Sequence, residues 1–256
     1  MNASKTFGLQ FVVLVHLAIA ATCNFACAED LANSEAKKRV EYLIELLASK
    51  NAAPEIQGNA EEGDDPTVRF GEKYSKTAQV AVYLAAQQLL AEDEFVIGML
   101  IEHFADKRYS YSVNAYHDDN LTVGEACSNI VERKIYSFES ELIRITRSGP
   151  HARYDSVGKW WNENKERGLG ALQLECIEEW IAFFENVDAK TALPIHPDAQ
   201  PTPLKEFEAG RAHNLHTLKA IRDSITQSGK PYLAKSLDTR TEYFFGLPWT
   251  GRKFNK

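Results

Sequence analysis

The sequence lacks the short motifs that mark common catalytic centres. It contains no Gly-x-Ser-x-Gly turn, no phosphate-binding loop and no His-Glu-x-x-His zinc motif. An excess of positive charge is also missing, because 29 Lys and Arg residues stand against 36 Asp and Glu residues. Nucleic-acid binding relies on a basic surface that displaces counterions, so this composition disfavours it. We expect no nucleic-acid partner, no metal and no other cofactor. The missing motifs favour a non-enzymatic protein without excluding an enzyme.

A long apolar run is missing as well. The apolar stretch Phe11–Ala21 is interrupted by His16, and it is shorter than the ~20 residues that span a bilayer. Lys5 precedes it, and Ala26-Cys27-Ala28 places small residues where signal peptidase reads them. We therefore predict a cleavable signal peptide over residues 1–28, export to the periplasm or the extracellular space, and no stable membrane insertion after cleavage. A membrane anchor is the competing interpretation.

Cysteine is scarce in the part that would remain. Cys23 and Cys27 lie in the predicted signal peptide, so the mature chain keeps Cys127 and Cys176. Two cysteines in an oxidising compartment can form a disulfide. Each of them also lies on an apolar helical stripe, where a thiol behaves as a small hydrophobic group. The spacing does not decide between a Cys127–Cys176 disulfide and two buried thiols, so both stay open.

Strand-like alternation is almost absent, whereas helical periodicity runs through most of the chain. Ser75 and Asp93 are the predicted N-caps of a helical hairpin that ends at Phe104. Thr122 and Glu125 match a capping box at the start of another helix. Further helical segments are predicted over 34–51, 138–146, 155–168, 172–187, 204–227 and 232–239. One face of the helix that follows Ser75 carries Val80, Tyr83, Leu84, Gln87 and Leu90.

The predicted organisation has four parts. Residues 1–28 are the signal peptide, 29–66 an N-terminal helix and acidic linker, and 67–192 the helical core. Residues 193–256 begin with a Pro-rich linker and continue with C-terminal helices. They end in an aromatic tail that we expect to pack on the core, with Tyr243, Phe244, Phe245 and Trp249.

The order of the predicted helices indicates an internal repeat. Helix pairs at 75–104, 122–146 and 155–187 follow in series, and Arg108-Tyr109 recurs as Arg153-Tyr154. The two Arg-Tyr pairs stand 45 residues apart. A repeat of this length lies in the range of HEAT and armadillo units, which are stacked helix pairs.

Over roughly residues 75–187 the chain resembles the HEAT-like helical-repeat proteins that bacteria export. The resemblance is carried by the hairpin Val80–Phe104, by Asp106-Lys107-Arg108-Tyr109, by Thr122-Val123-Gly124-Glu125, and by Lys159-Trp160-Trp161-Asn162-Glu163-Asn164-Lys165. It implies an all-α fold of stacked antiparallel helix hairpins with irregular long loops. It also implies a binding scaffold, and it supplies no catalytic residues.

The loop Ala105–Leu121 is the candidate contact site. Loops of this length in a compact domain are often functional, and Tyr and Arg are favoured contact residues. The alternative is that the tyrosines cover neighbouring helix ends. The candidate binding residues are Lys107, Arg108, Tyr109, Tyr111, Tyr116 and His117.

These observations lead to two functional hypotheses that involve a partner or substrate, beside the third possibility of a purely structural envelope protein with no discrete ligand. The first is an exported, non-enzymatic binding or scaffold protein that uses its helical-repeat surface and the 105–121 loop to contact a protein or an envelope component. The second is a hydrolase of extracellular or envelope polymers, with acids and histidines gathered from separate helices.

Overall fold

The computed structural model describes residues 34–57, 67–113, 119–146, 149–150, 157–190, 192–194 and 200–233. The chain divides into two units, Met1–Tyr42 and Leu43–Lys256. In the described part of the first unit, residues 34–42 are helical and Val40 is buried. The predicted signal peptide, the 232–239 helix beyond residue 233 and the aromatic tail lie outside the described residues.

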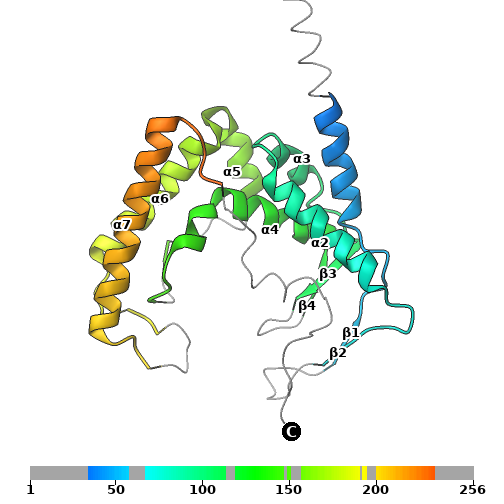
Figure 1. Cartoon of the computed structure of the whole chain (residues 1–256), viewed down its shortest axis with the longest axis horizontal. Coiled ribbons are helices and arrows are strands. Elements are labelled where there is room, and N and C mark those ends of the chain that lie inside the picture. Colours follow the sequence, from blue (N-terminus) through cyan, green and yellow to red (C-terminus); the bar gives the residue numbers. More distant parts are fainter. Residues whose placement is uncertain are drawn as a thin grey trace, which may run out of the picture. The chain divides into compact units, whose positions relative to one another are not determined.

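The second unit is mostly helical (Figure 1). Its helical segments are 43–46, which continues the first helix, α2 (Lys76–Ala91), α3 (Val96–Glu102), α4 (Val123–Ile135), the 3-10 turn η2 (Ser137–Glu141), α5 (Val157–Asn164), the 3-10 turn η4 (Lys165–Arg167), α6 (Gly168–Asn186) and α7 (Leu204–Ser228). Its strands are β1 (Glu55–Gln57), β2 (Thr67–Arg69), β3 (Tyr109–Val113) and β4 (Asp119–Thr122). Within the described ranges, no helix is both long and apolar enough to cross a membrane.

The two pairs of strands correct the expectation of an all-α chain. β1 pairs with β2, and β3 pairs with β4, each in an antiparallel two-stranded sheet. The second pair runs from Tyr109 to Thr122 and so occupies most of the predicted loop 105–121, and its register shifts between Tyr109 and Tyr111. The short alternation Tyr109-Ser110-Tyr111-Ser112-Val113 is the period-2 signal of a strand.

Helix α4 is the centre of the second unit. It packs against α2, α3, α6, η2, β3 and β4, and its apolar positions Cys127, Ile130 and Val131 are buried at helical spacing. The predicted capping box is confirmed. Glu125 N donates to Thr122 Oγ1 at 3.2 Å, and Thr122 N donates to Glu125 Oε2 at 2.6 Å.

Gly124 lets the chain cross close to the start of α4. Its N–H donates to the Asp106 carbonyl at 2.9 Å. A Cβ at this position would overlap the carbonyl oxygen of Phe104 and lie 2.8 Å from its carbonyl carbon. Because both atoms belong to the backbone, no side-chain movement can relieve the overlap. Glycine is therefore required here by space.

Two of the predicted helix boundaries are wrong. Helix α3 has Phe95 at its N-cap, and Asp93 contributes only its carbonyl oxygen, which accepts from Val96 N at 3.3 Å. The segment 122–146 is not a pair of α-helices, because α4 is followed by η2 and then by non-helical residues up to 146. The N-cap at Ser75 is confirmed, since its side chain accepts from Ala78 N at 3.2 Å. The HEAT-like repeat stays a prediction.

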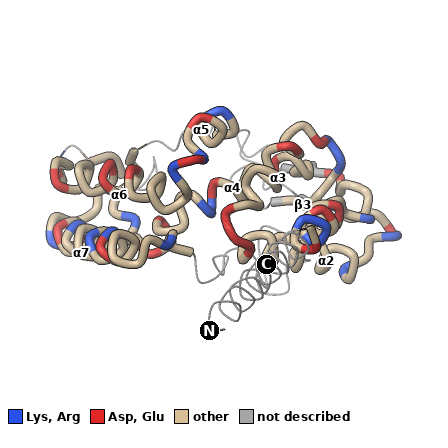
Figure 2. The backbone as a smooth tube through the Cα atoms, turned by 90° about the horizontal axis from the view of Figure 1, so that it is seen from above, with Lys and Arg blue, Asp and Glu red and all other residues tan. Residues whose placement is uncertain are grey.

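Helices α6 and α7 lie side by side and antiparallel (Figure 1). Lys219 on α7 pairs with Glu185 on α6 at 2.9 Å, and Arg222 pairs with Glu178 at 3.5 Å. Figure 2 shows acidic and basic residues along both helices. Exposed ion pairs of this kind contribute little to stability, so the apolar face between the helices supplies most of the packing energy.

Within the described residues, Cys127 and Cys176 are buried free thiols, and no disulfide joins them. Cys127 lies on α4 and Cys176 on α6, two helices that pack together. Burial raises the pKa of the Cys127 thiol to about 12. This thiol therefore stays protonated at neutral pH and unreactive.

Candidate functional site

The short segment after α7 returns to the body of the second unit. Helix α7 ends at Gly229, whose φ of 66° places it in the left-handed region that glycine adopts without strain. The following residues Lys230 and Pro231 pass over α6 at Gly170. A Cβ on Gly170 would lie 3.5 Å from Pro231 N. This is an ordinary contact distance, so the backbone of the segment packs directly against α6 at this position.

Gln173, one turn further along α6, holds the main chain of Tyr232. Its side chain is fully buried. Its Oε1 accepts from Tyr232 N at 2.7 Å, and its Nε2 donates to Tyr232 O at 2.8 Å. An amide that pairs with both the N–H and the C=O of one residue imitates a neighbouring β-strand. This pairing does not depend on which side chain the bound residue carries.

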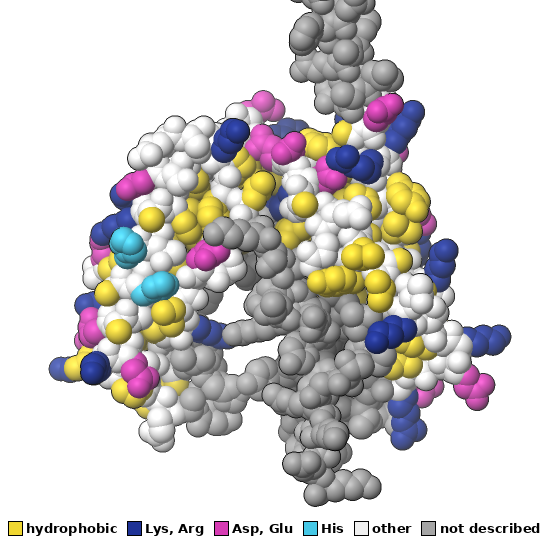
Figure 3. Space-filling model, viewed as in Figure 1, with side chains coloured by type: hydrophobic (Ala, Val, Ile, Leu, Met, Phe, Trp, Pro, Cys, Tyr) yellow, Lys and Arg dark blue, Asp and Glu magenta, His cyan; other side chains and the backbone are white. Residues whose placement is uncertain are grey.

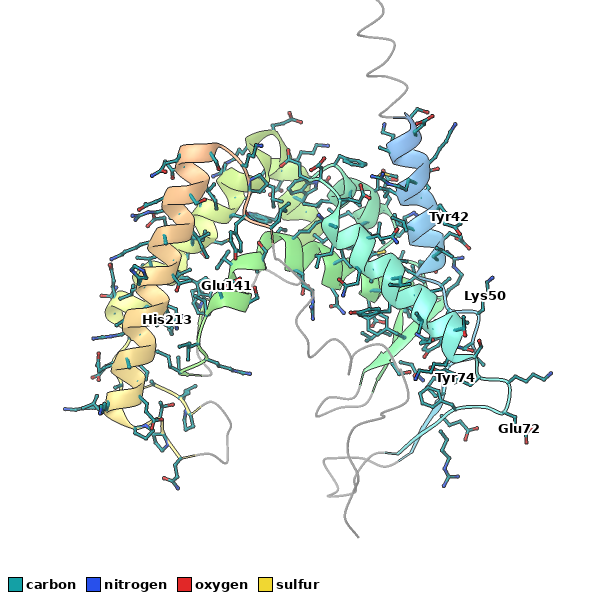
Figure 4. All side chains as sticks on the ribbon, in the orientation of Figure 1. Tyr42, Lys50, Glu72, Tyr74, Glu141 and His213 are labelled. Atoms are coloured by element: carbon teal, nitrogen blue, oxygen red, sulfur yellow. The ribbon has the colours of Figure 1, made fainter. Side chains whose placement is uncertain are left out.

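Two residues of η2 complete the arrangement. Ser137 Oγ donates to Tyr232 O at 2.7 Å, and the Tyr232 hydroxyl donates to Glu141 Oε1 at 2.7 Å. Glu141 is labelled in Figure 4, on the segment that packs against α7. Burial, reinforced by the bond to Glu141, raises the pKa of Tyr232 to about 12. We call Gln173, Ser137, Glu141 and Gly170 the Tyr232 clamp.

The clamp is linked to the end of α2 through Lys134. Gln173 Nε2 also donates to the Lys134 carbonyl at 2.8 Å. The Lys134 side chain is buried, and its Nζ donates to Leu90 O at 2.9 Å and to Glu92 O. A buried cation there satisfies carbonyls at the C-terminus of a helix. Burial lowers the pKa of Lys134 to about 8.

The same recognition chemistry occurs a second time on α7. Asn214 is fully buried; its Oδ1 accepts from Ile143 N at 2.8 Å, and its Nδ2 donates to Ile143 O at 2.8 Å. One turn earlier, a Cβ on Gly210 would overlap the Ile145 Cγ2 methyl. Each amide thus stands one turn from a glycine against which the crossing segment packs, and only Gly210 leaves no space for a Cβ. The fold uses this device at two separate crossings.

Two partly buried carboxyl groups lie near the clamp in sequence. Burial raises the pKa of both Glu132 and Glu139 to about 7, and the charge of Glu139 adds to the rise for Glu132. Trp180 Nε1 donates to Glu139 Oε1 at 3.2 Å, and Ser128 Oγ donates to Glu132 Oε1 at 3.4 Å. Carboxyl groups with a pKa near neutrality are the type that general acid–base catalysis uses.

The predicted contact residues of the 105–121 segment have different surroundings. Lys107 is exposed. Arg108 Nη2 pairs with Asp106 Oδ2 at 2.7 Å and its Nη1 with Glu45 Oε1 at 2.5 Å, and these bonds lower the pKa of both carboxyl groups. Its guanidinium is therefore already engaged within the fold. Tyr116 and His117 lie outside the described residues.

The two described tyrosines of that segment pack inward to different degrees. Tyr111 is buried, and its hydroxyl accepts from Asn129 Nδ2 at 3.0 Å. Tyr109 is partly buried and shares a hydrogen bond of 2.9 Å with Ser112 Oγ. Tyr111 thus packs within the fold, and its role as a contact residue stays a prediction.

A metal centre is not formed in the described part of the chain, where no three His, Cys, Asp or Glu side chains are grouped to hold an ion. His213, labelled in Figure 4, is exposed on α7 and interacts with Thr217 at 3.4 Å. His216 is exposed one turn later.

The residues of the clamp were not singled out from the sequence, although a signal exists. Gln173 follows Leu172 and precedes Cys176 and Ile177, so it stands on an apolar stripe. Asn214 stands in the same way between Phe207 and Leu218. A buried amide must find hydrogen-bond partners. A lone Asn or Gln on the apolar face of a helix therefore indicates that another segment crosses there.

The comparisons with known proteins give no further guide to the site. No protein-family model, no curated protein and no solved structure matches this chain.

Proposed function

We propose that this chain is an exported, non-enzymatic binding protein that captures an extended peptide segment at the Tyr232 clamp. The observation that carries the proposal is the pairing of Gln173 with both main-chain groups of Tyr232, at 2.7 and 2.8 Å. In this proposal the protein's own Lys230–Leu233 segment occupies the site until a partner segment replaces it. The partner is a protein or peptide of the compartment to which the chain is exported.

The geometry of the clamp supports two levels of recognition. Main-chain pairing with Gln173 and Ser137 supplies affinity for any extended segment. The bond from the phenol to Glu141 adds a preference for tyrosine at the central position. A hydrogen bond to a charged group contributes ~1.5–3 kcal/mol, which corresponds to about a ten- to hundredfold preference over phenylalanine.

The protein's own segment competes with any partner. It is joined to α7 by Gly229 alone, and a short tether gives an effective concentration on the order of millimolar. Replacing Tyr232 weakens this internal competitor, because the phenol bond and the contacts of the ring are lost. The clamp side chains on α6 and η2 are unchanged by that replacement.

The test uses the full chain and a fluorescent peptide with the sequence Gly-Lys-Pro-Tyr-Leu-Ala. The Tyr232→Ala variant is expected to bind this peptide at least tenfold more tightly than the wild type, measured by fluorescence anisotropy. Adding Gln173→Leu to that variant is expected to abolish binding. Adding Gln88→Leu, an exposed glutamine on α2, is the matched control and leaves binding unchanged. Equal binding by the Tyr232→Ala variant with and without Gln173→Leu refutes the proposal.

A second candidate function rests on Glu132 and Glu139. Their raised pKa values favour the alternative of a hydrolase acting on envelope or extracellular polymers. This alternative predicts that the full chain releases reducing ends from a cell-wall polysaccharide. Glu132→Gln and Glu139→Gln should each lower that rate at least a hundredfold. Unchanged rates in both variants remove the alternative.

A further inference from the structure

The segment held in the Tyr232 clamp reads Lys230-Pro231-Tyr232-Leu233, and its side chains have unlike surroundings. Lys230 is exposed and Leu233 is 43% exposed, whereas Pro231 and Tyr232 are partly buried. On the face of α7 that Figure 3 shows, acidic, basic and hydrophobic side chains are mixed, so this face carries charges of both signs. The fold thus contacts the Pro-Tyr pair more closely than the residues on either side of it.

Proline suits the position over α6 because it has no N–H. The amide bond between Lys230 and Pro231 lies against Gly170, since a Cβ on that glycine would be 3.5 Å from Pro231 N and 3.7 Å from Lys230 C. The Ile225 Cγ2 methyl would also be 3.5 Å from that Cβ, so the amide bond rests beside an apolar side chain. An N–H brought to such a surface loses its bond to water and gains no acceptor from it. Any other residue at this position brings that N–H to the clamp.

Proline also prepares the segment for pairing with Gln173. Its ring fixes its own φ at about −65° and keeps the preceding residue extended. Gln173 pairs with both the N–H and the C=O of Tyr232, at 2.7 and 2.8 Å, and an extended residue presents these two groups on one side. A segment that is already extended loses less conformational entropy when it binds.

The tyrosine is recognised through its hydroxyl group. The Tyr232 hydroxyl donates to Glu141 Oε1 at 2.7 Å, and Glu141 is partly exposed on η2. A carboxylate accepts this hydrogen bond and repels an anion. A phosphate on the tyrosine oxygen would remove the donated hydrogen and place negative charge beside Glu141. The free hydroxyl is therefore the form that fits the clamp.

Gln173 keeps hydrogen-bond partners when the segment leaves. Its Nε2 carries two hydrogens and donates toward Lys134 O at 2.8 Å, Ser137 Oγ at 3.1 Å and Tyr232 O at 2.8 Å. The first two acceptors belong to α4 and η2, so they stay in place after Tyr232 is released. Both hydrogens therefore keep an acceptor in the emptied clamp, which favours the exchange of one segment for another.

We infer that the clamp selects partner segments that contain Pro-Tyr with an unmodified tyrosine hydroxyl, whatever residues flank this pair. The inference rests on the proposed capture of a peptide at the clamp and adds the class of segment that is captured. Modification of the hydroxyl in a partner prevents its capture.

Competition binding to the full-length Tyr232→Ala chain tests the inference. Fluorescent Gly-Lys-Pro-Tyr-Leu-Ala is displaced by unlabelled peptides of the same length, and the anisotropy gives each affinity. Replacing the proline of the peptide by alanine is expected to weaken binding about tenfold, because an N–H is left without a partner. Replacing it by N-methylalanine, which also has no N–H, should cause a smaller loss. Replacing both the flanking lysine and the flanking leucine by alanine should change the affinity less than about threefold.

The role of Glu141 is tested with a phosphate on the tyrosine of the peptide. This phosphate is expected to weaken binding to the Tyr232→Ala chain about a hundredfold. Adding Glu141→Gln to that chain removes the negative charge, and the loss caused by the phosphate should fall below about tenfold. Adding Glu72→Gln instead is the matched control, since Glu72 is an exposed glutamate that Figure 4 labels, and the loss should stay at its full size.

The outcomes separate this inference from the proposed function. If the unmodified Pro-Tyr peptide itself does not bind to the Tyr232→Ala chain, peptide capture is wrong and the inference falls with it. If that peptide binds and the peptide with alanine in place of proline binds equally well, capture stands and the inference is overturned. Equal binding of the phosphorylated and unmodified peptides overturns the inference as well.

Discussion

Replacing Gln173 by leucine tests how the protein holds the segment after α7. The amide accepts one hydrogen bond from Tyr232 N and donates toward Lys134 O, Ser137 Oγ and Tyr232 O. Its Nε2 carries only two hydrogens, so the three acceptors share them. Leucine fills a similar volume and supplies none of these bonds.

The expected loss of stability in Gln173→Leu depends on which of the unpaired main-chain groups can reach water. A buried polar group left without a partner costs ~1–3 kcal/mol. The N–H and C=O of Tyr232 can avoid that cost, because the 230–233 segment can leave the clamp. The Lys134 carbonyl belongs to α4 and cannot leave. We therefore expect a global loss of about 1–3 kcal/mol, which for a domain of this size lowers the melting temperature by roughly 2–12 °C.

Two measurements separate the global effect from the local one. Urea unfolding followed by circular dichroism gives the free energy of unfolding, and hydrogen exchange gives the protection of the Tyr232 amide. Exchange of that amide should accelerate at least tenfold in Gln173→Leu. The control Gln88→Leu changes the free energy of unfolding by less than about 0.5 kcal/mol. If Tyr232 exchange is unchanged in Gln173→Leu, the amide does not hold the segment and the reasoning is wrong.

Two further predictions concern packing and pH. Gly124→Ala should lose about 1–3 kcal/mol or more of stability in thermal melts, because its Cβ overlaps the Phe104 backbone. Gly98→Ala, in α3 with no atom within 4 Å of the added Cβ, should instead gain about 0.5–1 kcal/mol; similar losses in both variants would contradict the steric argument. Because the pKa values of Glu132 and Glu139 are raised from 4.5 to about 7, the folded state holds more protons than the unfolded chain between these values. The stability that they contribute is full below pH ~4.5 and is lost as the pH rises through ~7. Urea midpoints of the wild type should therefore fall relative to Glu139→Gln over this range, and parallel curves would show that Glu139 does not titrate as described.

Local signals predicted several elements because their causes lie within a few residues. The Ser75 cap and the Thr122–Glu125 capping box are satisfied inside a single turn, so the sequence alone indicates them. Helix α7 ends near its predicted boundary because Gly229 adopts a left-handed φ. The β3–β4 pair was missed because its strands gain their hydrogen bonds from each other, across residues that no helical or turn pattern relates.

The surroundings of the predicted contact residues could not be inferred from the sequence for a related reason. Arg108 and Tyr111 are typical contact residues by type, yet Glu45, Asp106 and Asn129 engage them within the fold. Only the three-dimensional arrangement reveals those partners. On α2, the periodic face that contains Val80, Tyr83 and Leu84 could have been taken for the core side. The side that carries Val82, Ala86 and Leu89 is buried instead.

Local hydrogen bonding and composition are enough to indicate a mostly helical chain and the helix caps at Ser75 and Thr122. Packing between distant segments sets which face of α2 is buried, keeps Cys127 and Cys176 as thiols, and selects the main-chain groups that Gln173 and Asn214 hold. These outcomes depend on contacts between residues far apart in the chain. These contacts stabilise the protein only after α4, α6 and α7 have packed together.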